Sequence, residues 1–376
     1  MDETIRAKLA QIDELFPPER LAKSRARWTR LWRGEAPLDR HPFLYFPYAL
    51  PYYDAGFTPG ERLHANLDEF IVRGHVQDDF IPSFFPGCRQ STIPNMFGAQ
   101  EVIVDRDYTC RRLIGHADDV DRLPPPSLAP GTVAHEWLEM QRYVLEATEG
   151  RLPIHVTDMQ GPPDVCGQLW GYDEFLASAY EAPERYHALM DRVTHAFILF
   201  WDAQRSLLGE AFVGTHLWGW NWVPPDAGAS LSADSLVMIS PTFYSEFFQP
   251  YLQRIGERFG GLAVHSCGHF PAVIPPLCAT PTVKAVNAGE MSLPELYSAG
   301  VRSQTLIIAG ADADTIEETF SLIRSCNLRV DMSIRGLWPN APFAEWTAEH
   351  WQGIRRIEER VLTAAEGGAA MGREPT

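Results

Sequence analysis

The sequence lacks several features that would assign it to a common functional class. It has no apolar run of 18 residues, and its first residues, MDETIRAKLAQIDELF, form an amphipathic pattern without the apolar centre of a secretion signal. We therefore expect a cytoplasmic protein without a membrane partner. Basic residues are scarce, with 32 Lys and Arg against 49 Asp and Glu and a formal charge of −17. Because so acidic a chain repels a phosphate backbone, we expect no nucleic-acid partner.

Nucleotide-binding motifs and paired cysteines are also missing. Neither a Gly-x-Gly-x-x-Gly nor a Walker A sequence follows any candidate strand, which disfavours nucleotide-binding α/β folds. No Cys-x-x-Cys pair occurs among the six cysteines, which are Cys88, Cys110, Cys166, Cys267, Cys278 and Cys326. We expect free thiols, most of them buried and one or two available as ligands.

From Phe43 onward, short apolar runs of strand length alternate with longer helical patterns. The strand candidates are runs that begin at Phe43, Phe80, Pro153, Phe212, Leu262, Val283, Thr305 and Leu328. Helical patterns cover residues 1–35, 62–74, 134–148, 173–206, 241–259, 292–299, 314–325 and 343–364. Eight strand–helix units predict an α/β protein with a (β/α)8 TIM-barrel fold, and an open doubly wound sheet is the alternative.

The same pattern predicts the domain organisation. Residues 1–40 are expected to form an N-terminal helical extension, and residues 41–365 the barrel. Residues 366–376, EGGAAMGREPT, are expected to form a flexible tail.

Polar residues at the carboxyl ends of the strands are the candidate functional residues, because the chemistry of a barrel gathers there. They are Asp158 and Gln160 after strand three, His216, Trp218 and Trp220 after strand four, His265, Cys267 and His269 after strand five, Asn287 and Glu290 after strand six, Asp312 after strand seven and Arg335 after strand eight.

His265 and Cys267 carry the clearest chemical signal. Residues two apart in a strand point to the same side, so these two side chains are expected to project together. An imidazole and a thiolate at this spacing can hold zinc, with further ligands from neighbouring strand ends. The alternative is a packed and hydrogen-bonded pair without a metal. His269 joins the pair only if the extended backbone continues past Gly268.

Other residues carry a functional and a structural interpretation side by side. Asp158 is expected to orient substrate or to bind a cation, or else to cap its loop. Arg335 and Arg89 are expected to hold a substrate anion, or else to form surface ion pairs. His216, Trp218 and Trp220 alternate in strand phase with Trp222. They predict a substrate-binding wall, or else a packed aromatic rim.

Two stretches resemble the uroporphyrinogen decarboxylase superfamily. One is Gly261–Gly268, GLAVHSCG, preceded by the helix pattern MISPTFYSEFFQPY, and the other is IHVTDMQGPPDV from Ile154. The resemblance covers roughly residues 75–360. It implies a (β/α)8 barrel and two branches of activity. One branch decarboxylates porphyrinogen acetate groups without a cofactor. The other transfers methyl groups with corrinoid proteins and binds zinc through His-x-Cys and a distant second Cys. The resemblance also places an acidic residue near the pocket at Asp234.

The departures from each branch are informative. The Met-Arg-Gln-Ala-Gly-Arg stretch of the porphyrinogen enzymes is absent, and SFFPGCRQ stands in a comparable place with Arg89 alone. A substrate with many carboxylates needs several cations, so the methyltransferase branch is favoured. That branch's second Cys is missing after strand eight, where the sequence reads SIRGLW, and Cys326 lies before the strand. Glu290 is the preferred replacement ligand, and His269, Asp234 and His216 are further candidates.

The sequence thus predicts a methyltransferase-like enzyme that uses zinc on His265, Cys267 and Glu290 and acts on a small organic substrate. His265, Asp158 and Asp234 are the predicted catalytic residues. Arg89, His216, Trp218, Trp220, Asn287 and Arg335 are the predicted substrate-binding residues. A corrinoid protein or a folate would carry the methyl group, and a homodimer is the expected assembly if the chain associates. The alternatives are a metal-free decarboxylase or lyase that uses His265 and Asp158, and a non-catalytic barrel that binds a tetrapyrrole or pterin.

Overall fold

The computed structural model describes residues 2–49, 56–104, 107–214 and 221–366. The helices are α1 (Glu3–Leu15), α2 (Pro18–Arg33), α3 (Pro59–Gly74), α4 (Thr92–Met96), α5 (Val133–Ala147), α6 (Pro162–Trp170), α7 (Tyr172–Glu181), α8 (Pro183–Leu208), α9 (Pro241–Phe243), α10 (Gln249–Phe259), α11 (Ile274–Ala279), α12 (Leu293–Ser298), α13 (Ile316–Ser325) and α14 (Ala348–Glu366). The strands are β1 (Leu44–Tyr45), β2 (Glu101–Val104), β3 (Asp107–Cys110), β4 (Ile154–His155), β5 (Phe212–Val213), β6 (Ala229–Ser232), β7 (Leu262–Ser266), β8 (Val283–Ala288), β9 (Leu306–Asp312) and β10 (Val330–Arg335).

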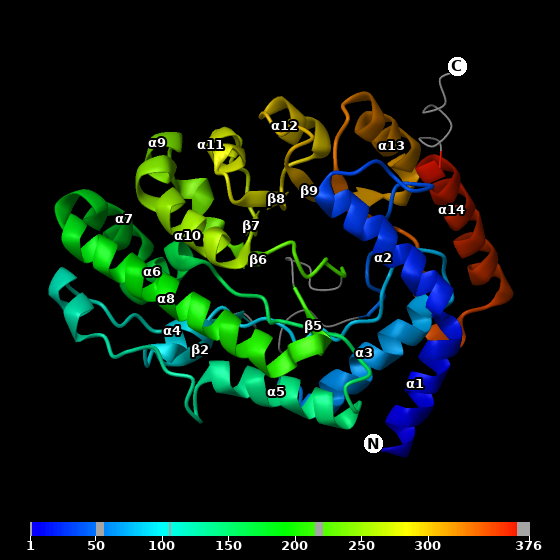
Figure 1. The fold of residues 1–376 in the computed structure, drawn as a ribbon, viewed down its shortest axis with the longest axis horizontal. Coiled ribbons are helices and arrows are strands. Elements are labelled where there is room, and N and C mark those ends of the chain that lie inside the picture. The colour runs from blue at the N-terminus through cyan, green and yellow to red at the C-terminus, as the bar shows by residue number, and fades with distance from the viewer. Residues whose placement is uncertain (1, 50–55, 105–106, 215–220, 367–376) are drawn as a thin grey trace.

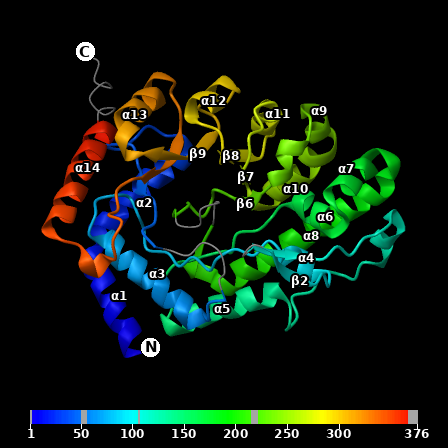
Figure 2. The same ribbon diagram turned by 180° about the vertical axis from the view of Figure 1, so that it is seen from behind.

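Parallel strands form a closed ring that the helices surround, as Figure 1 and Figure 2 show from opposite sides. Most of the ring is a six-stranded sheet in the order β1-β10-β9-β8-β7-β6. β4 pairs with β5, and bridges join Phe84 to Ile154 and Gln160 to Ser232. The Asp79 amide donates to the Phe43 carbonyl at 3.0 Å. This hydrogen bond links the start of β1 to the segment that leads to Phe84. The described strand positions therefore close on themselves, which confirms the predicted barrel over the open sheet.

Only part of the predicted strand four can be compared with the structure. Of the run from Phe212 to Trp218, residues 215–218 lie outside the described residues; β5 covers Phe212–Val213, and β6 completes this position of the ring. Gly228 brings the chain back at φ +100°, and a Cβ there would meet the Gly261 carbonyl oxygen at 2.1 Å. Only glycine fits this turn and this close approach.

Two helices differ from their prediction. The pattern over 173–206 is two helices, α7 and α8, because Pro183 disfavours helical backbone at Ala182, where φ is −145°. The last helix begins at Ala348, whereas the pattern placed its start at residue 343, and only a short 3₁₀ turn (Phe343–Glu345) precedes it. β2 and β3 pair antiparallel with each other and form a separate two-stranded sheet outside the ring.

The N-terminal helix α2 is bound to the barrel through buried polar contacts. Trp32 donates its indole N–H to Asp331 in β10 at 3.3 Å. Asp79, fully buried beside β1, accepts from Arg27 and Arg40 at 2.7 Å each. These contacts join the N-terminal segment to β10 and to the chain around Asp79, the two neighbours of β1 in the ring. Helices α1 and α14, from the two ends of the described chain, lie on the same side of the ring in both views.

No described helix combines the length and the apolar character needed to cross a bilayer. The six cysteines all lie in the described residues, and all are free thiols, as predicted. Only Cys88 and Cys166 are buried, so the prediction that most of them are buried is wrong.

Candidate functional site

His265 and Cys267 stand where β7 ends, at the carboxyl end of the barrel. All five residues of β7 are buried, and the His265 side chain remains buried at the strand end while Cys267 is exposed. The distance from His265 Nε2 to Cys267 Sγ is 3.0 Å. The two side chains therefore meet on one side of the strand, as the two-residue spacing predicts.

Asn287, which lies beside His265 in β8, fixes the orientation of the imidazole. Its Oδ1 is 2.5 Å from His265 Nδ1, and its Nδ2 donates to the Ile308 carbonyl at 2.5 Å. Because the amide must donate to a carbonyl, its oxygen faces the imidazole, and Nδ1 carries the hydrogen. The lone pair of His265 Nε2 then points toward Cys267. A histidine ligand held through its other nitrogen is the usual arrangement in metal sites.

Asp234 completes a group of three donors. It is the first residue of the 3₁₀ helix Asp234–Met238, which follows β6. Its Oδ1 accepts from the Cys267 amide at 2.7 Å and lies 3.8 Å from His265 Nε2. One imidazole nitrogen, one thiol sulfur and one carboxylate oxygen all lie within 4.8 Å of one another.

Asp164 holds this arrangement from α6, although its function was not predicted from the sequence. It is fully buried, and its two carboxylate oxygens accept from the Asp234 amide at 2.6 Å and the Ser235 amide at 2.8 Å. Burial raises the pKa of Asp164, and the nearby Asp234 carboxylate adds to this effect. The available signal was its position in the Pro-Pro-Asp sequence after strand three, since an acid there begins a helix at the barrel mouth.

The electrostatics of the group suit a cation. Burial lowers the pKa of His265, which leaves its imidazole neutral at physiological pH and able to act as a ligand. Burial raises the pKa of Cys267 to about 12, and Asp234 adds to this increase. Without a cation the thiol therefore stays protonated and donates to His265. Nitrogen, sulfur and oxygen donors at this spacing fit zinc, which binds these three atom types.

The other candidate metal ligands lie outside this group. Glu290, which the sequence placed among the ligands in preference to Asp234, lies in the turn after β8 and raises the pKa of Cys267 by its charge without joining the three donors. His269 is half exposed and lies 3.6 Å from Glu295. His216 lies outside the described residues. Among the described residues, the structure therefore favours Asp234 as the third donor.

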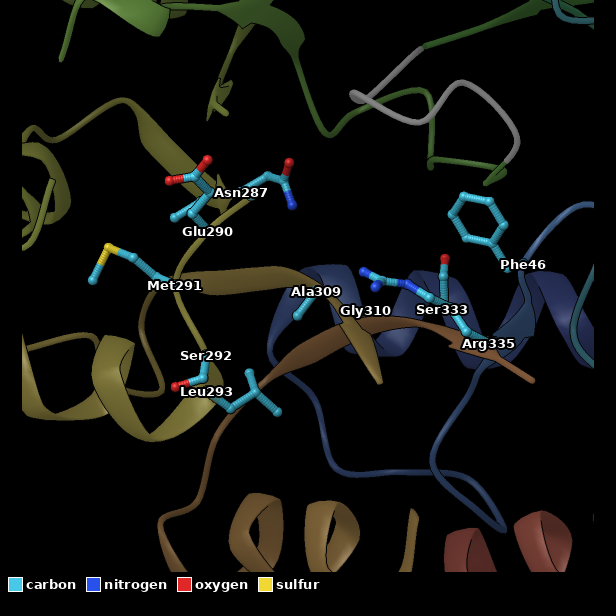
Figure 3. Close-up of a pocket in the computed structure, with 12 residues that line it drawn as sticks. Phe46, Asn287, Glu290, Met291, Ser292, Leu293, Ala309, Gly310, Ser333 and Arg335 are labelled. Carbon is cyan, nitrogen blue, oxygen red and sulfur yellow. The ribbon is translucent and has the colours of Figure 1, made fainter. Parts of the chain in front are cut away.

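A small pocket adjoins the three donors. Its volume is about 230 Å³, and its lining includes Asn287, Glu290, Ser333 and Arg335. Asn287 also contacts His265, so this side chain lies between the pocket and the donor group. Figure 3 shows Asn287 and Glu290 on one side of the pocket, and Arg335 with Phe46 on the other. Arg335 lies over Gly310, where a Cβ would meet its Nη2 at 2.6 Å.

The two arginines predicted to hold an anion have different surroundings. Arg335 lines the pocket at the end of β10, and its guanidinium lies 6.0 Å from the Phe46 ring. Arg89 is ion-paired with Glu136 at 2.6 Å and lies over the rings of Tyr108 and Trp137. Its charge is therefore already compensated by the protein, and Arg335 is the better placed of the two to meet a ligand.

The remaining predicted residues are Asp158 and two tryptophans. Asp158 is buried near the mouth, where Ser232 Oγ lies 3.5 Å from its Oδ1, and its charge contributes to the raised pKa of Cys267. Trp218 and Trp220 lie outside the described residues. Trp222 is half-buried and packs against the hydrophobic core.

The chain has distant similarity to known proteins. No protein-family model matches the chain. Over 175 residues the chain is 26% identical to the uroporphyrinogen decarboxylase of Xanthomonas campestris pv. campestris (strain B100), and the match covers 44% of each protein. The enzyme of the same name from Xanthomonas axonopodis pv. citri (strain 306) matches equally well in identity and coverage. The chain thus matches less than half of the length of these relatives.

Among solved structures, a methyltransferase from Methanosarcina mazei has a similar fold. The TM-score is 0.63 at 14% sequence identity, and the match covers 89% of this chain and 98% of that protein. At this identity the likeness establishes the fold, and it agrees with the barrel predicted from the sequence.

Proposed function

Because the chain is a distant relative of the uroporphyrinogen decarboxylases, we propose that it is an enzyme of that superfamily with metal-assisted, methyltransferase-like activity on a small organic substrate. The observation that carries the proposal is the group formed by Asp234, His265 and Cys267, whose ligand atoms lie within 4.8 Å of one another. The name of the structurally similar Methanosarcina protein supports methyl transfer as the reaction class.

The three residues would hold zinc, and surrounding side chains would keep them in place. When bound there, zinc would keep Cys267 deprotonated and lower the pKa of a coordinated thiol or polarise a substrate heteroatom. Asn287 holds His265 with Nε2 directed at the site. Asp164 holds the backbone of Asp234 through two hydrogen bonds. These contacts fix the donor atoms before any ligand arrives, which reduces the cost of binding.

The pocket beside the three donors is the proposed binding place for the substrate. Its only described lining cation is Arg335, which we propose holds one substrate anion. A porphyrinogen carries many carboxylates and needs several cations, so the pocket favours a small substrate over a tetrapyrrole. A corrinoid protein or a folate is the proposed methyl carrier, and Asp158 and the Trp218 and Trp220 segment are proposed to complete the substrate site.

A metal-free decarboxylase is the second candidate, because the curated relatives are uroporphyrinogen decarboxylases. In that case His265 and Asp158 would act as acid and base. The chemistry of Cys267 argues against this candidate. A thiol with a pKa of about 12 contributes neither a nucleophile nor a base near neutral pH without a cation.

One pair of assays separates the two candidates. Zinc-loaded protein is mixed with methylcobalamin and a panel of small thiols, and loss of the methyl–cobalt absorbance is followed. The same protein, freed of metal, is mixed with uroporphyrinogen, and carbon dioxide is measured. We expect zinc-dependent demethylation that disappears in Cys267→Ala and persists in Cys326→Ala, a control thiol at the end of α13 that takes no part in the donor group. Carbon dioxide release by the metal-free protein would contradict the proposal.

A further inference from the structure

The pocket beside the donor group is lined by two side chains of opposite charge. Glu290 lies in the turn after β8 on one side of the pocket, and Arg335 lies at the end of β10 on the other (Figure 3); both are exposed to solvent. Within the described ranges, the structure records no ion pair or hydrogen bond for either side chain. A protein surface that keeps a carboxylate and a guanidinium unpaired around one pocket is suited to a ligand that brings the complementary charges.

We propose that the pocket binds a small α-amino acid, with its carboxylate on Arg335 and its ammonium group on Glu290. This inference deepens the proposed function, because it names the substrate class for the same site. A guanidinium can bind a carboxylate through two parallel hydrogen bonds, and a carboxylate can accept from an ammonium group. The two ends of the ligand would thus be held by the two sides of the pocket.

The rest of the lining is mixed and more polar than apolar. Asn287, Ser292 and Ser333 contribute polar groups, and Met291, Leu293 and Ala309 a smaller apolar part, which suits an amino acid with a small or partly polar side chain. The pocket volume of about 230 Å³ lies below the roughly 300–1,000 Å³ of pockets that hold drug-sized ligands. It therefore suits a small ligand rather than a tetrapyrrole.

The charge arrangement also excludes simpler ligand classes. A dicarboxylate would place its second charge near Glu290, and an amine without a carboxylate would face Arg335. Like charges brought together in this way are repelled, which is how a site rejects a wrong ligand. Asn287 lines the pocket and contacts His265, so an amino acid bound there would lie beside the three donors.

Calorimetric titration of the zinc-loaded protein tests this inference directly. The probes are L-alanine, L-leucine, L-methionine and L-norleucine, followed by N-acetyl-L-norleucine, L-norleucinamide and hexanoate. We expect at least one free amino acid to bind, and its N-acetyl and amide derivatives to bind about tenfold or more weakly, because each leaves one charge of the pocket unpaired. The titration extends to 10 mM of each probe. Equal binding of hexanoate and L-norleucine would overturn the inference, and so would the absence of binding by any amino acid within that range.

Two variants assign the ends of the ligand. Glu290→Gln is expected to remove the preference for the free amine over the N-acetyl derivative, and Arg335→Gln the preference for the free carboxylate over the amide. Glu318→Gln, an exposed acid on α13, is the matched control and is expected to keep both preferences. Zinc content is measured in every variant. Full zinc without amino-acid binding would overturn this inference alone, whereas loss of zinc in Glu290→Gln would make Glu290 a metal ligand and overturn its assignment to the amine.

Discussion

Replacement of Asn287 by leucine tests whether the imidazole of His265 is held for a metal. Leucine has a similar shape but cannot accept from His265 Nδ1 or donate to the Ile308 carbonyl, the two contacts of Asn287. Loss of a group that orients a histidine ligand typically weakens metal binding about 10- to 100-fold. This range corresponds to about 1.4 to 2.7 kcal/mol. The two unpaired polar groups should also lower the free energy of unfolding by about 2 to 4 kcal/mol.

The assay is competition for zinc between the purified apoprotein and a chromophoric chelator. Asn287→Asp keeps an acceptor for Nδ1 and should bind zinc within about tenfold of the wild type. Gln141→Leu is the matched control, since Gln141 is a buried amide that donates to the His155 carbonyl and to Gln204, with no part in the donor group. It should lose stability but keep its zinc affinity. If Asn287→Leu binds zinc within about twofold of the wild type, the orienting function of Asn287 is refuted.

Three further predictions follow from the same structure. Zinc affinity should rise about tenfold per pH unit from pH 7 to 8, because the pKa of Cys267 is raised to about 12 and one proton is released per ion, whereas burial lowers the pKa of His265 and keeps it neutral in this range. An affinity independent of pH would be inconsistent with Cys267 as a ligand. Burial raises the pKa of Asp331 to about 7 from 3.8. Stability from this group is therefore present below about pH 4 and lost as the pH rises through 7, by up to about 4 kcal/mol. Urea unfolding at pH 5 and pH 8 should show a smaller decline in Asp331→Asn, and an unchanged decline would assign the effect to other groups. Gly310→Ala should displace Arg335, whose Nη2 lies 2.6 Å from the added Cβ, and weaken ligand binding with little change in Tm. Gly353→Ala, where the Cβ meets nothing within 4 Å, is its control, and equal ligand binding by both variants would argue against a binding function for Arg335.

The barrel was predictable because its signals are local. Each strand of a (β/α)8 barrel is a short apolar run, and the runs at Leu262 and Val283 are strands β7 and β8 in the structure. Strand four was not predictable in the same way. Its two halves, β5 and β6, are separated by a long excursion, and the return of the chain depends on the contact of Gly228 with Gly261. A contact between residues so far apart leaves no mark in local periodicity.

The candidate site was also predictable only where its signals are local. The pairing of His265 with Cys267 follows from the two-residue period of a strand, and the structure has it at 3.0 Å. The third donor depends on where a loop folds back. Asp234 reaches the site because Asp164, in another helix, binds its backbone, whereas Glu290, which follows the strand on the other side of β7, lines the pocket. Sequence spacing offers several acids at the barrel mouth, and only the packing of the loops selects among them.

The most direct test of the account is the metal content of the purified protein, measured by mass spectrometry for the wild type and three variants. We expect about one zinc ion per chain in the wild type and in Glu290→Gln, and loss of that ion in Cys267→Ala and in Asp234→Ala. Circular dichroism would verify that every variant is folded. A folded wild-type protein that takes up no zinc even when the ion is supplied, or a zinc content that is unchanged in Cys267→Ala, would contradict the proposed metal centre.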